Sequence, residues 1–255
     1  MLVERIAELL GPFLDPASGQ RLTSDDLVRV STYLDLLLRW NARINLTAVR
    51  HSEDIVQRHF GESFFLARHL FPAPSGNCHP EPSQGPRRAR PSGDGVGSRG
   101  SRDPLPTEPL AAAVPRVIDL GSGAGFPALP LKIWNPGIGL VLVESNHKKV
   151  AFLREVTRAL TLTNVDIISE RAESLLPSLG PAFPPADVVT FRAVERFNQI
   201  LPTATALLSS APGSRLAVLV GSAQLSSTTA LPNLGWTTFP LPNAESRVLS
   251  IGVRQ

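Results

Sequence analysis

The sequence predicts an α/β fold in which a mostly parallel β-sheet, with its last strand antiparallel, follows a small N-terminal helical region. From Val114 onward, short apolar segments alternate with segments that have helical periodicity. This alternation is typical of a parallel sheet with helices on both faces. Before residue 72, the apolar residues recur at helical spacing and no such alternation is present, so this part is expected to be helical.

The N-terminal region, residues 1–71, is expected to contain three helices. The first is short and covers residues 2–10. The second begins after Ser24, which is a suitable N-cap. Apolar residues at helical spacing mark this second helix: Leu27, Val30, Leu34, Leu37 and Trp40 or Ile44. The third covers residues 52–70 and has these apolar residues: Ile55, Phe60, Phe64, Phe65 and Leu66.

Residues 72–113 have a different composition. They hold 9 of the 24 prolines of the chain and few large apolar residues. Such a segment cannot bury enough surface to offset the entropy of ordering it, so we predict a disordered insertion. A solvated spacer is favoured over an RNA-binding tail, since acidic residues accompany its five arginines.

Residues 114–255 are expected to form the sheet. Five parallel strands are predicted over residues 116–120, 140–144, 165–169, 187–191 and 215–220. A final antiparallel pair is predicted over 235–241 and 247–253, and the clearest helix over 147–160. Ligands of such sheets bind at the carboxyl ends of the strands, so the residues that follow the strands define the expected site.

Composition excludes several kinds of protein. No run of eighteen apolar residues or positively charged leader is present, which argues against a membrane span or a secretory signal. The single cysteine, Cys78, excludes intrachain disulfides and thiolate metal clusters, and the five histidines lack partners at metal-ligand spacing. We therefore expect a cytoplasmic protein without a metal. The net charge of +3 is small, so it does not indicate a large nucleic-acid-binding surface.

A glycine-rich turn follows the first predicted strand. It reads Asp119-Leu-Gly-Ser-Gly-Ala-Gly125, and glycines allow a ligand to approach the backbone closely. A dinucleotide fingerprint would require a glycine where Phe126 stands, so the spacing favours S-adenosylmethionine (SAM). Glu144, which ends the second predicted strand, can accept hydrogen bonds from a ribose diol. Asp119 is expected to bind the loop amides or the ligand's amino group, the alternative being a structural carboxylate.

Charged residues follow other predicted strands. The backbone at Ala172 and Glu173 could contact an adenine edge, although an ordinary helix start is equally compatible. Arg192 follows the fourth strand, where a buried guanidinium needs an anionic partner. The carboxylate of SAM or an RNA phosphate would serve. Lys148 and Lys149 stand at the start of a predicted helix, where their charges oppose the helix dipole. They indicate either a nearby anion or simply a solvent-exposed face of the helix.

Several motifs together match one known family. They are Trp40-Asn41 with Asn45-Leu46-Thr47, Arg58-His59 with Glu62-Ser63, Asp119 to Pro127, Glu144-Ser145, Lys148-Lys149, Phe152-Leu153, Arg171 to Glu173, and Arg192-Ala193. Through them the chain resembles the glucose-inhibited division protein B family, the small-subunit ribosomal RNA guanine-N7 methyltransferases. The resemblance covers residues 25–71 and 114–255.

The resemblance implies a Rossmann-like class I SAM-dependent methyltransferase sheet, SAM as cofactor, and small-subunit ribosomal RNA or the 30S particle as partner of a monomeric enzyme. It also implies that Arg192 and Arg247 are catalytic and face the methyl-transfer centre or RNA. The cofactor-binding residues would be Asp119, Gly121, Ser122, Gly123, Gly125, Phe126, Glu144, Ala172, Glu173 and Arg192.

Two positions depart from the family pattern. Glu62 stands where the family commonly has Asp, and Val220 stands where it usually has Lys. Because a cation is missing at residue 220, one alternative function is that of a catalytically weak protein that binds RNA or the ribosome. A SAM methyltransferase for a small molecule or a protein is another alternative.

Absent motifs favour N7 chemistry. Guanine N7 carries a lone pair and no proton, so its methylation requires no general base and depends on orientation. Exocyclic-amine methylation typically uses an Asn/Asp-Pro-Pro-aromatic loop, which does not follow the fourth strand. Pyrimidine C5 methylation needs a thiolate, and Cys78 lies in the predicted insertion.

Overall fold

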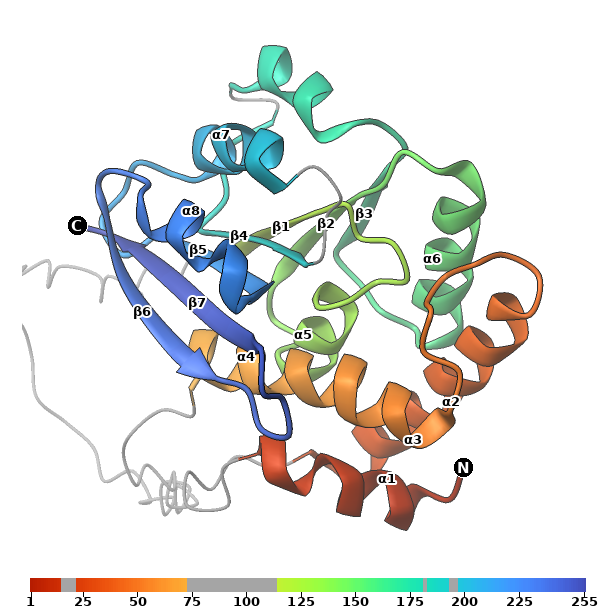
Figure 1. The fold of residues 1–255 in the computed structure, drawn as a ribbon. Coiled ribbons are helices and arrows are strands. Elements are labelled where there is room, and N and C mark those ends of the chain that lie inside the picture. The colour runs from red at the N-terminus through yellow and green to blue at the C-terminus, as the bar shows by residue number, and fades with distance from the viewer. Residues whose placement is uncertain (15–21, 73–113, 181–182, 193–196) are drawn as a thin grey trace, which may run out of the picture. The chain divides into compact units, whose positions relative to one another are not determined.

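The computed structural model describes residues 1–14, 22–72, 114–180, 183–192 and 197–255. Met1–Ala73 and Val114–Gln255 belong to one compact unit (Figure 1). Except for Pro72, the predicted insertion, with Cys78, lies outside the described residues. The proposed division of the chain at residues 71 and 114 remains a prediction.

The N-terminal region is helical, as predicted. Its elements are α1 (Val3–Leu10), the 3₁₀ turn η1 (Gly11–Phe13), α2 (Ser24–Asn41), α3 (Ser52–Ile55), the π-helical segment η3 (Val56–Gly61) and α4 (Glu62–Leu70). The predicted N-cap of α2 is wrong by one residue. Thr23 caps the helix, because its hydroxyl accepts from Asp26 N at 3.2 Å while the Asp26 carboxylate accepts from Thr23 N at 3.0 Å.

Seven strands form one sheet in the order β3-β2-β1-β4-β5-β7-β6. They are β1 (Arg116–Leu120), β2 (Gly139–Val143), β3 (Val165–Ile168), β4 (Val188–Arg192), β5 (Arg215–Gly221), β6 (Leu234–Pro240) and β7 (Arg247–Arg254). β1 to β5 pair in parallel, and β7 pairs antiparallel with β5 and β6. This topology confirms the predicted fold class. Every predicted strand except β1 is off by one residue at one or both ends, so Glu144 follows β2 and Arg192 is the last residue of β4.

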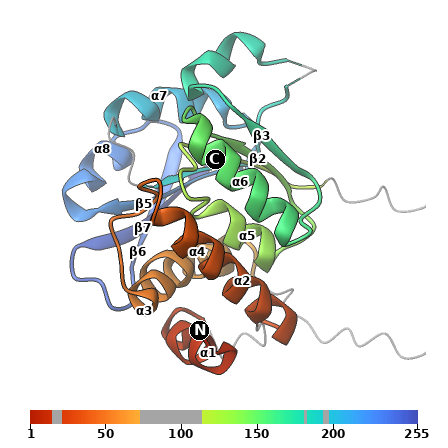
Figure 2. The ribbon, with the colours of Figure 1, turned by 90° about the vertical axis from the view of Figure 1, so that its right-hand side faces the viewer.

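Helices cover both faces of the sheet (Figures 1 and 2). The N-terminal helices lie on one face with α5 (Ala128–Trp134) and α6 (His147–Ala159), where they share one apolar core. The other face packs against the 3₁₀ segment η4 (Ala172–Ser178) and α7 (Phe197–Leu207). The 3₁₀ turn η5 (Ser222–Gln224) and α8 (Leu225–Thr229) connect β5 to β6. Tyr33, Phe60, Phe64 and Phe152, all fully buried, are among the largest side chains of the first core.

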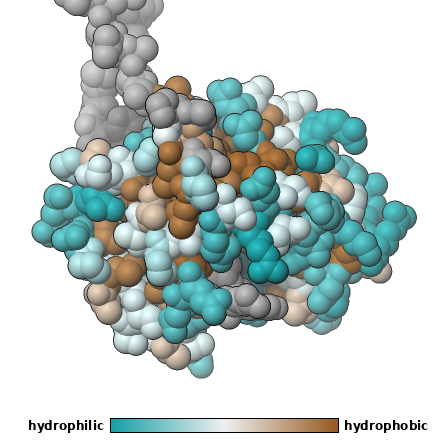
Figure 3. Space-filling model, turned by 90° about the horizontal axis from the view of Figure 1, so that it is seen from above, coloured by the Kyte–Doolittle hydropathy of each residue, from teal (hydrophilic) through white to brown (hydrophobic). Residues whose placement is uncertain are grey.

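The surface seen from above in Figure 3 is mixed. Hydrophobic residues gather in a band near its middle, and hydrophilic residues surround them. Among the helices of the described residues, none has the length and hydrophobicity that a membrane span requires.

Candidate functional site at the carboxyl ends of the strands

The glycine loop follows β1 at the centre of the sheet. Gly121, Gly123 and Gly125 have φ angles of 68°, 56° and 86°, which residues with a Cβ atom rarely adopt. A Cβ atom on Gly125 would also overlap the Tyr33 hydroxyl and would lie 2.6 Å from Leu129 Cδ1. A Cβ atom on Gly123 would meet only Gly121 O, at 3.7 Å. The sequence pattern therefore has two separate causes, a left-handed backbone throughout and close packing at Gly125.

The loop is fixed to the end of β2 through its amides. Gly121 N and Ser122 N donate to Val143 O at 2.9 and 3.0 Å. Gly123 N donates to Glu144 Oε2 at 2.9 Å, and Asn146 N donates to Glu144 Oε1 at 2.8 Å. Glu144 is buried, so these backbone partners stabilise its carboxylate while each oxygen keeps a lone pair for another donor.

Asp119 occupies the base of the loop and is completely buried. Neither of its carboxylate oxygens has a hydrogen-bond partner among the described residues. Burial raises the pKa of Asp119 to about 7, although the nearby Ser122 hydroxyl, which donates to the Asp119 backbone oxygen at 3.1 Å, acts to lower it; the Glu144 carboxylate adds a smaller increase. The amides of Gly121, Ser122 and Gly123 bond to Val143 and Glu144 instead of to Asp119. The predicted contact of Asp119 with a ligand's amino group, and its alternative of a structural carboxylate, both stay predictions.

An aromatic cluster supports the loop from the N-terminal helices. The Tyr33 hydroxyl donates to Ala124 O, and the Tyr33 ring stacks on Phe126 with centroids 5.2 Å apart. His59 stacks on Phe126 at 5.0 Å, and Phe60 meets it edge-on at the same distance. The Phe126 ring is thus engaged in packing the loop onto α2 and η3, whereas its predicted contact with cofactor stays untested.

A second group of charged residues lies where β4 and β5 end and β7 begins, on the side of the N-terminal helices. Glu62, which begins α4, is 2% exposed. Arg192 Nη2 lies 3.3 Å from Glu62 Oε2, and Arg247 Nη2 lies 2.6 Å from Glu62 Oε1. One buried carboxylate thus joins two guanidinium groups that are 55 residues apart in the sequence, which leaves this arginine pair with an excess positive charge.

His59 is the fourth member of this group. Its Nδ1 lies 3.0 Å from Arg192 Nη2, and its Nε2 lies 2.6 Å from Thr47 Oγ1. Arginine only donates, so Nδ1 accepts and the proton of the neutral ring is on Nε2. Burial, together with the charges of Arg192, Arg58 and Arg247, lowers the pKa of His59 to about 2. His59 is therefore an acceptor for Arg192 rather than a cation or a proton shuttle at neutral pH.

Val220 lies on the opposite face of the sheet from this group. Its side chain is buried in the core beneath α7, whereas Arg192 and Arg247 lie toward α4. Arg215 cannot substitute for the missing lysine, because it begins β5 and donates to Leu70 O at the other end of the strand. Residue 220 therefore carries no cation, and its side chain is not part of the group formed by Arg192, Arg247 and Glu62.

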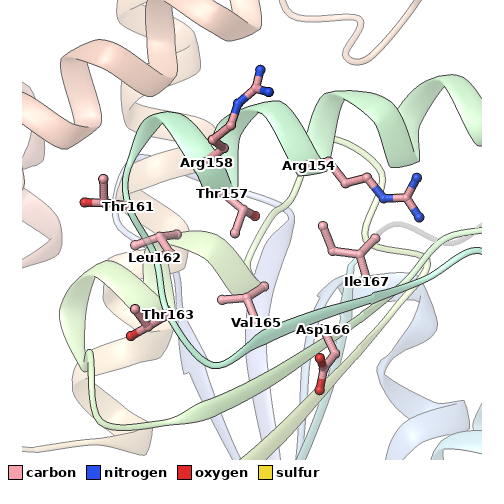
Figure 4. A pocket seen from close by; sticks show the side chains of 9 residues that line it. All are labelled: Arg154, Thr157, Arg158, Thr161, Leu162, Thr163, Val165, Asp166 and Ile167. Atoms are coloured by element: carbon pink, nitrogen blue, oxygen red, sulfur yellow. The ribbon is translucent and has the colours of Figure 1, made fainter.

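Two hollows accompany these elements. One, of about 250 Å³, is lined by Glu62 and Arg247 of the arginine group, with Arg58 and Asn243 nearby. The other, of about 510 Å³, lies between the end of α6 and the edge strand β3. In Figure 4 the guanidinium groups of Arg154 and Arg158, which line the second hollow, point in different directions, that of Arg158 upward and that of Arg154 to the right. Of these two hollows, only the first is lined by the ion pair of Glu62 and Arg247.

The chain is similar in sequence to known proteins that share one name. The GidB family model, described as rRNA small subunit methyltransferase G, matches residues 106–230. A Chloroflexus aggregans protein named Ribosomal RNA small subunit methyltransferase G is 34% identical over 192 residues, which are 75% of this chain and 63% of the relative. The chain is thus similar to rRNA small subunit methyltransferase G proteins over about three quarters of its length.

Two further relatives carry the same name. The Xylella fastidiosa protein is 33% identical over 184 residues, 72% of this chain and 65% of the relative. The Leuconostoc mesenteroides protein is 29% identical over 246 residues, 92% of this chain and 85% of the relative. The chain thus spans just under two thirds of the length of the first two relatives and most of the third.

The structure brings most of the residues predicted for an rRNA small subunit methyltransferase G protein to one edge of the sheet. Asp119, the glycine loop and Glu144 form one part, and Arg192 with Arg247 forms another. Ala172 is buried and Glu173 exposed at the start of η4, next to β3. No three histidine, cysteine, aspartate or glutamate side chains gather into a possible metal site in the described ranges.

Sequence reasoning missed the residues that support the two arginines. It identified Glu62, His59 and Thr47 only as parts of family motifs. The available signal was the pairing of a histidine and an acid three residues apart on a segment rich in buried aromatics. That spacing places both side chains on one helical face, but nothing local identifies their partners.

Proposed function

We propose that this protein is a SAM-dependent methyltransferase that methylates N7 of a guanine in small-subunit ribosomal RNA. The observation that carries the proposal is the pairing of two unlike groups at one edge of the sheet. A buried acid without a hydrogen-bond partner among the described residues lies below the glycine loop, and two arginines with one shared acid lie at the end of β4 and the start of β7. The first group suits a cofactor that has an ammonium group, and the second suits an anionic substrate.

The residues present fit SAM. Its ammonium group would neutralise Asp119, whose two buried oxygens lack partners. Its ribose diol would donate to Glu144, and its adenine would lie beside Ala172 and Glu173. The left-handed glycines would let the backbone contact the ligand closely. When bound, SAM supplies an electrophilic methyl group.

The protein's own task is then binding and orientation. Guanine N7 attacks with a lone pair and loses no proton, so no residue of the site has to act as a general base. The neutral His59 is already bonded to Arg192 and Thr47. Arg192 and Arg247 would hold the RNA so that N7 faces the methyl donor, which is catalysis by proximity.

The names of the relatives support ribosomal RNA as the substrate and the small subunit as the partner. A protein or small-molecule substrate gains no such support. Val220 was the reason to consider a weakly active binding protein, and the arginine pair on the other face of the sheet weakens that reason. We also propose that the enzyme acts as a monomer, which size-exclusion chromatography would test.

The test uses the full chain, labelled SAM and small-subunit particles from a strain that lacks this methylation. We expect label in 16S ribosomal RNA, and mapping should locate it as N7-methylguanosine. Label at another atom, or none in particles while free metabolites accept methyl groups, would contradict the proposal. The mapped position also identifies the guanine.

A further inference from the structure

A continuous series of contacts leads from the end of α2 to the arginine pair. Asn41, the last residue of α2, accepts from Leu46 N at 2.9 Å and from Thr47 N at 3.0 Å. Its Nδ2 also donates to Thr47 O at 3.1 Å. One buried amide therefore closes the turn and fixes the backbone on both sides of Thr47.

Thr47 transmits this position to His59. The Thr47 hydroxyl oxygen accepts from Val49 N at 3.1 Å and from His59 Nε2 at 2.6 Å. With its proton on Nε2, the ring offers the Nδ1 lone pair to Arg192 Nη2 at 3.0 Å. The stack of His59 on Phe126, at 5.0 Å, restricts the remaining rotation of the ring.

The arginines at the end of this series keep unused donors. Arg192 Nη1 and Arg247 Nε are buried and have no hydrogen-bond partner among the described residues. Glu62 compensates one of the two positive charges, so the pair has the charge and the donors to bind a single anion. Arg247 is 31% exposed, which leaves that anion a route to solvent.

We propose that Glu62, His59 and Thr47 are positioning residues that hold Arg192 and Arg247 as a binding site for one backbone phosphate of the substrate RNA. This inference rests on the proposed function and adds the part of the substrate that the arginines contact. A phosphodiester is favoured over the carboxylate of SAM, because Asp119 and the glycine loop already offer SAM a separate set of contacts. The Trp-Asn…Asn-Leu-Thr element of the sequence then serves RNA binding through His59.

Two pairs of variants test the proposal. Thr47→Val keeps the shape of the side chain but removes the hydroxyl that bonds His59, whereas Thr47→Ser keeps the hydroxyl. Glu62→Gln removes the carboxylate charge shared by the arginines. Its control, Glu53→Gln, removes a charge from a surface ion pair with Arg5 (2.9 Å) on the neighbouring helix. Each full-length variant is assayed for SAM affinity by calorimetry and for 16S RNA affinity by filter binding at several salt concentrations.

We expect Glu62→Gln to weaken RNA binding about tenfold and to lower the salt slope of log K by about one, as for the loss of one phosphate contact. Thr47→Val should weaken RNA binding about threefold, and Thr47→Ser should recover most of that loss. Glu53→Gln should match the wild type, and SAM affinity should stay within twofold throughout.

Three results would overturn the positioning role. The first is unchanged RNA affinity in Glu62→Gln and Thr47→Val despite lower melting temperatures, which would show a purely structural network. The second is a loss of SAM affinity in place of RNA affinity, which would assign the arginines to the SAM carboxylate. The third, decisive if Glu62→Gln does not fold, is equal RNA binding by Thr47→Val and Thr47→Ser. Wild-type protein that binds RNA but leaves guanine N7 unmethylated would refute the proposed function alone.

Discussion

The glycine loop and the arginine pair lie at the same edge of the sheet, yet they stabilise buried polar groups in opposite ways. The loop satisfies its amides with neighbours in β2 but leaves the Asp119 carboxylate without a partner. In the arginine pair the buried acid, Glu62, forms ion pairs with two cations, and Arg192 Nη1, Arg247 Nε and Glu62 Oε1 make no hydrogen bond within the described residues. One part thus lacks a cation and the other has room for an anion. Complementary deficits of this kind suit a cationic cofactor and an anionic substrate that bind side by side.

The largest expected effect concerns Asp119. Its folded-state pKa of about 7 exceeds the unfolded value of 3.8, so the folded state binds more protons between these pH values. Stability without ligand should therefore fall as pH rises through this window, by roughly 4 kcal/mol from this group. Urea unfolding from pH 4 to 8 measures the slope, and Asp119→Asn should remove most of it. Equal slopes in both proteins would show that Asp119 has a partner.

Gly125 provides the next largest effect and separates packing from backbone conformation. Gly125→Ala places a Cβ against Tyr33 and Leu129 at a positive φ, which should cost about 3 kcal/mol of unfolding free energy. Gly123→Ala has the same backbone strain without the overlap and should cost about 1 kcal/mol. Denaturant titrations of both variants give the comparison. If the losses were equal, the packing against Tyr33 would be unimportant.

Arg192→Gln should separate the two parts of the site. Because the substituted side chain cannot carry the charge, kcat/KM for small-subunit particles should fall about a hundredfold, which corresponds to roughly 2.7 kcal/mol. The Kd for SAM should stay within threefold of wild type. Steady-state kinetics and calorimetry provide the two values. A large loss of SAM affinity would instead unite the arginine pair with the cofactor part.

The smallest expected effect is that of Glu144→Gln. The amide oxygen can still accept from one backbone N–H, whereas the carboxylate accepts from both Gly123 and Asn146. Losing one charge-assisted bond should cost about 1 kcal/mol, or five- to tenfold in SAM affinity. Calorimetry measures this, and RNA affinity serves as the internal control. If Glu144→Gln lowered RNA affinity more than SAM affinity, Glu144 would belong to the RNA-binding part of the site rather than to the cofactor part.

Sequence reasoning was successful where the physical cause is local. The strands and the glycine turn depend on contiguous apolar runs and on backbone conformations that only glycine adopts readily, and both were confirmed. The bounds of α5 and α7 were not predicted, because α5 is buried over nearly its whole length and α7 contains Pro202. α5 therefore lacks the polar face from which periodicity is recognised, whereas α7 has exposed Asn198 and Gln199 beside buried apolar residues at helical spacing, a signal that sequence reasoning missed.

The arginine pair depends on contacts between residues far apart in the sequence, which sequence reasoning could not predict. Arg192 was predicted from its place at the end of a strand, but its partners are 130 and 133 residues away. A single sequence contains no signal for such pairing, since the register of η3 and α4 on the sheet emerges only from packing of the apolar core. The predicted contacts of Phe126, Ala172 and Glu173 with a cofactor stay predictions.

The hydrogen bond from Tyr33 to Ala124 links the loop to a helix residue that precedes Ala124 by 91 positions in the sequence. Thermodynamic linkage requires that a ligand which orders the loop also stabilises the docking of α2, by the same free energy that docked α2 contributes to ligand binding. Local opening of α2 should therefore become rarer when the cofactor binds. Hydrogen exchange should show slower amide exchange around Tyr33, on a helix that need not touch the ligand.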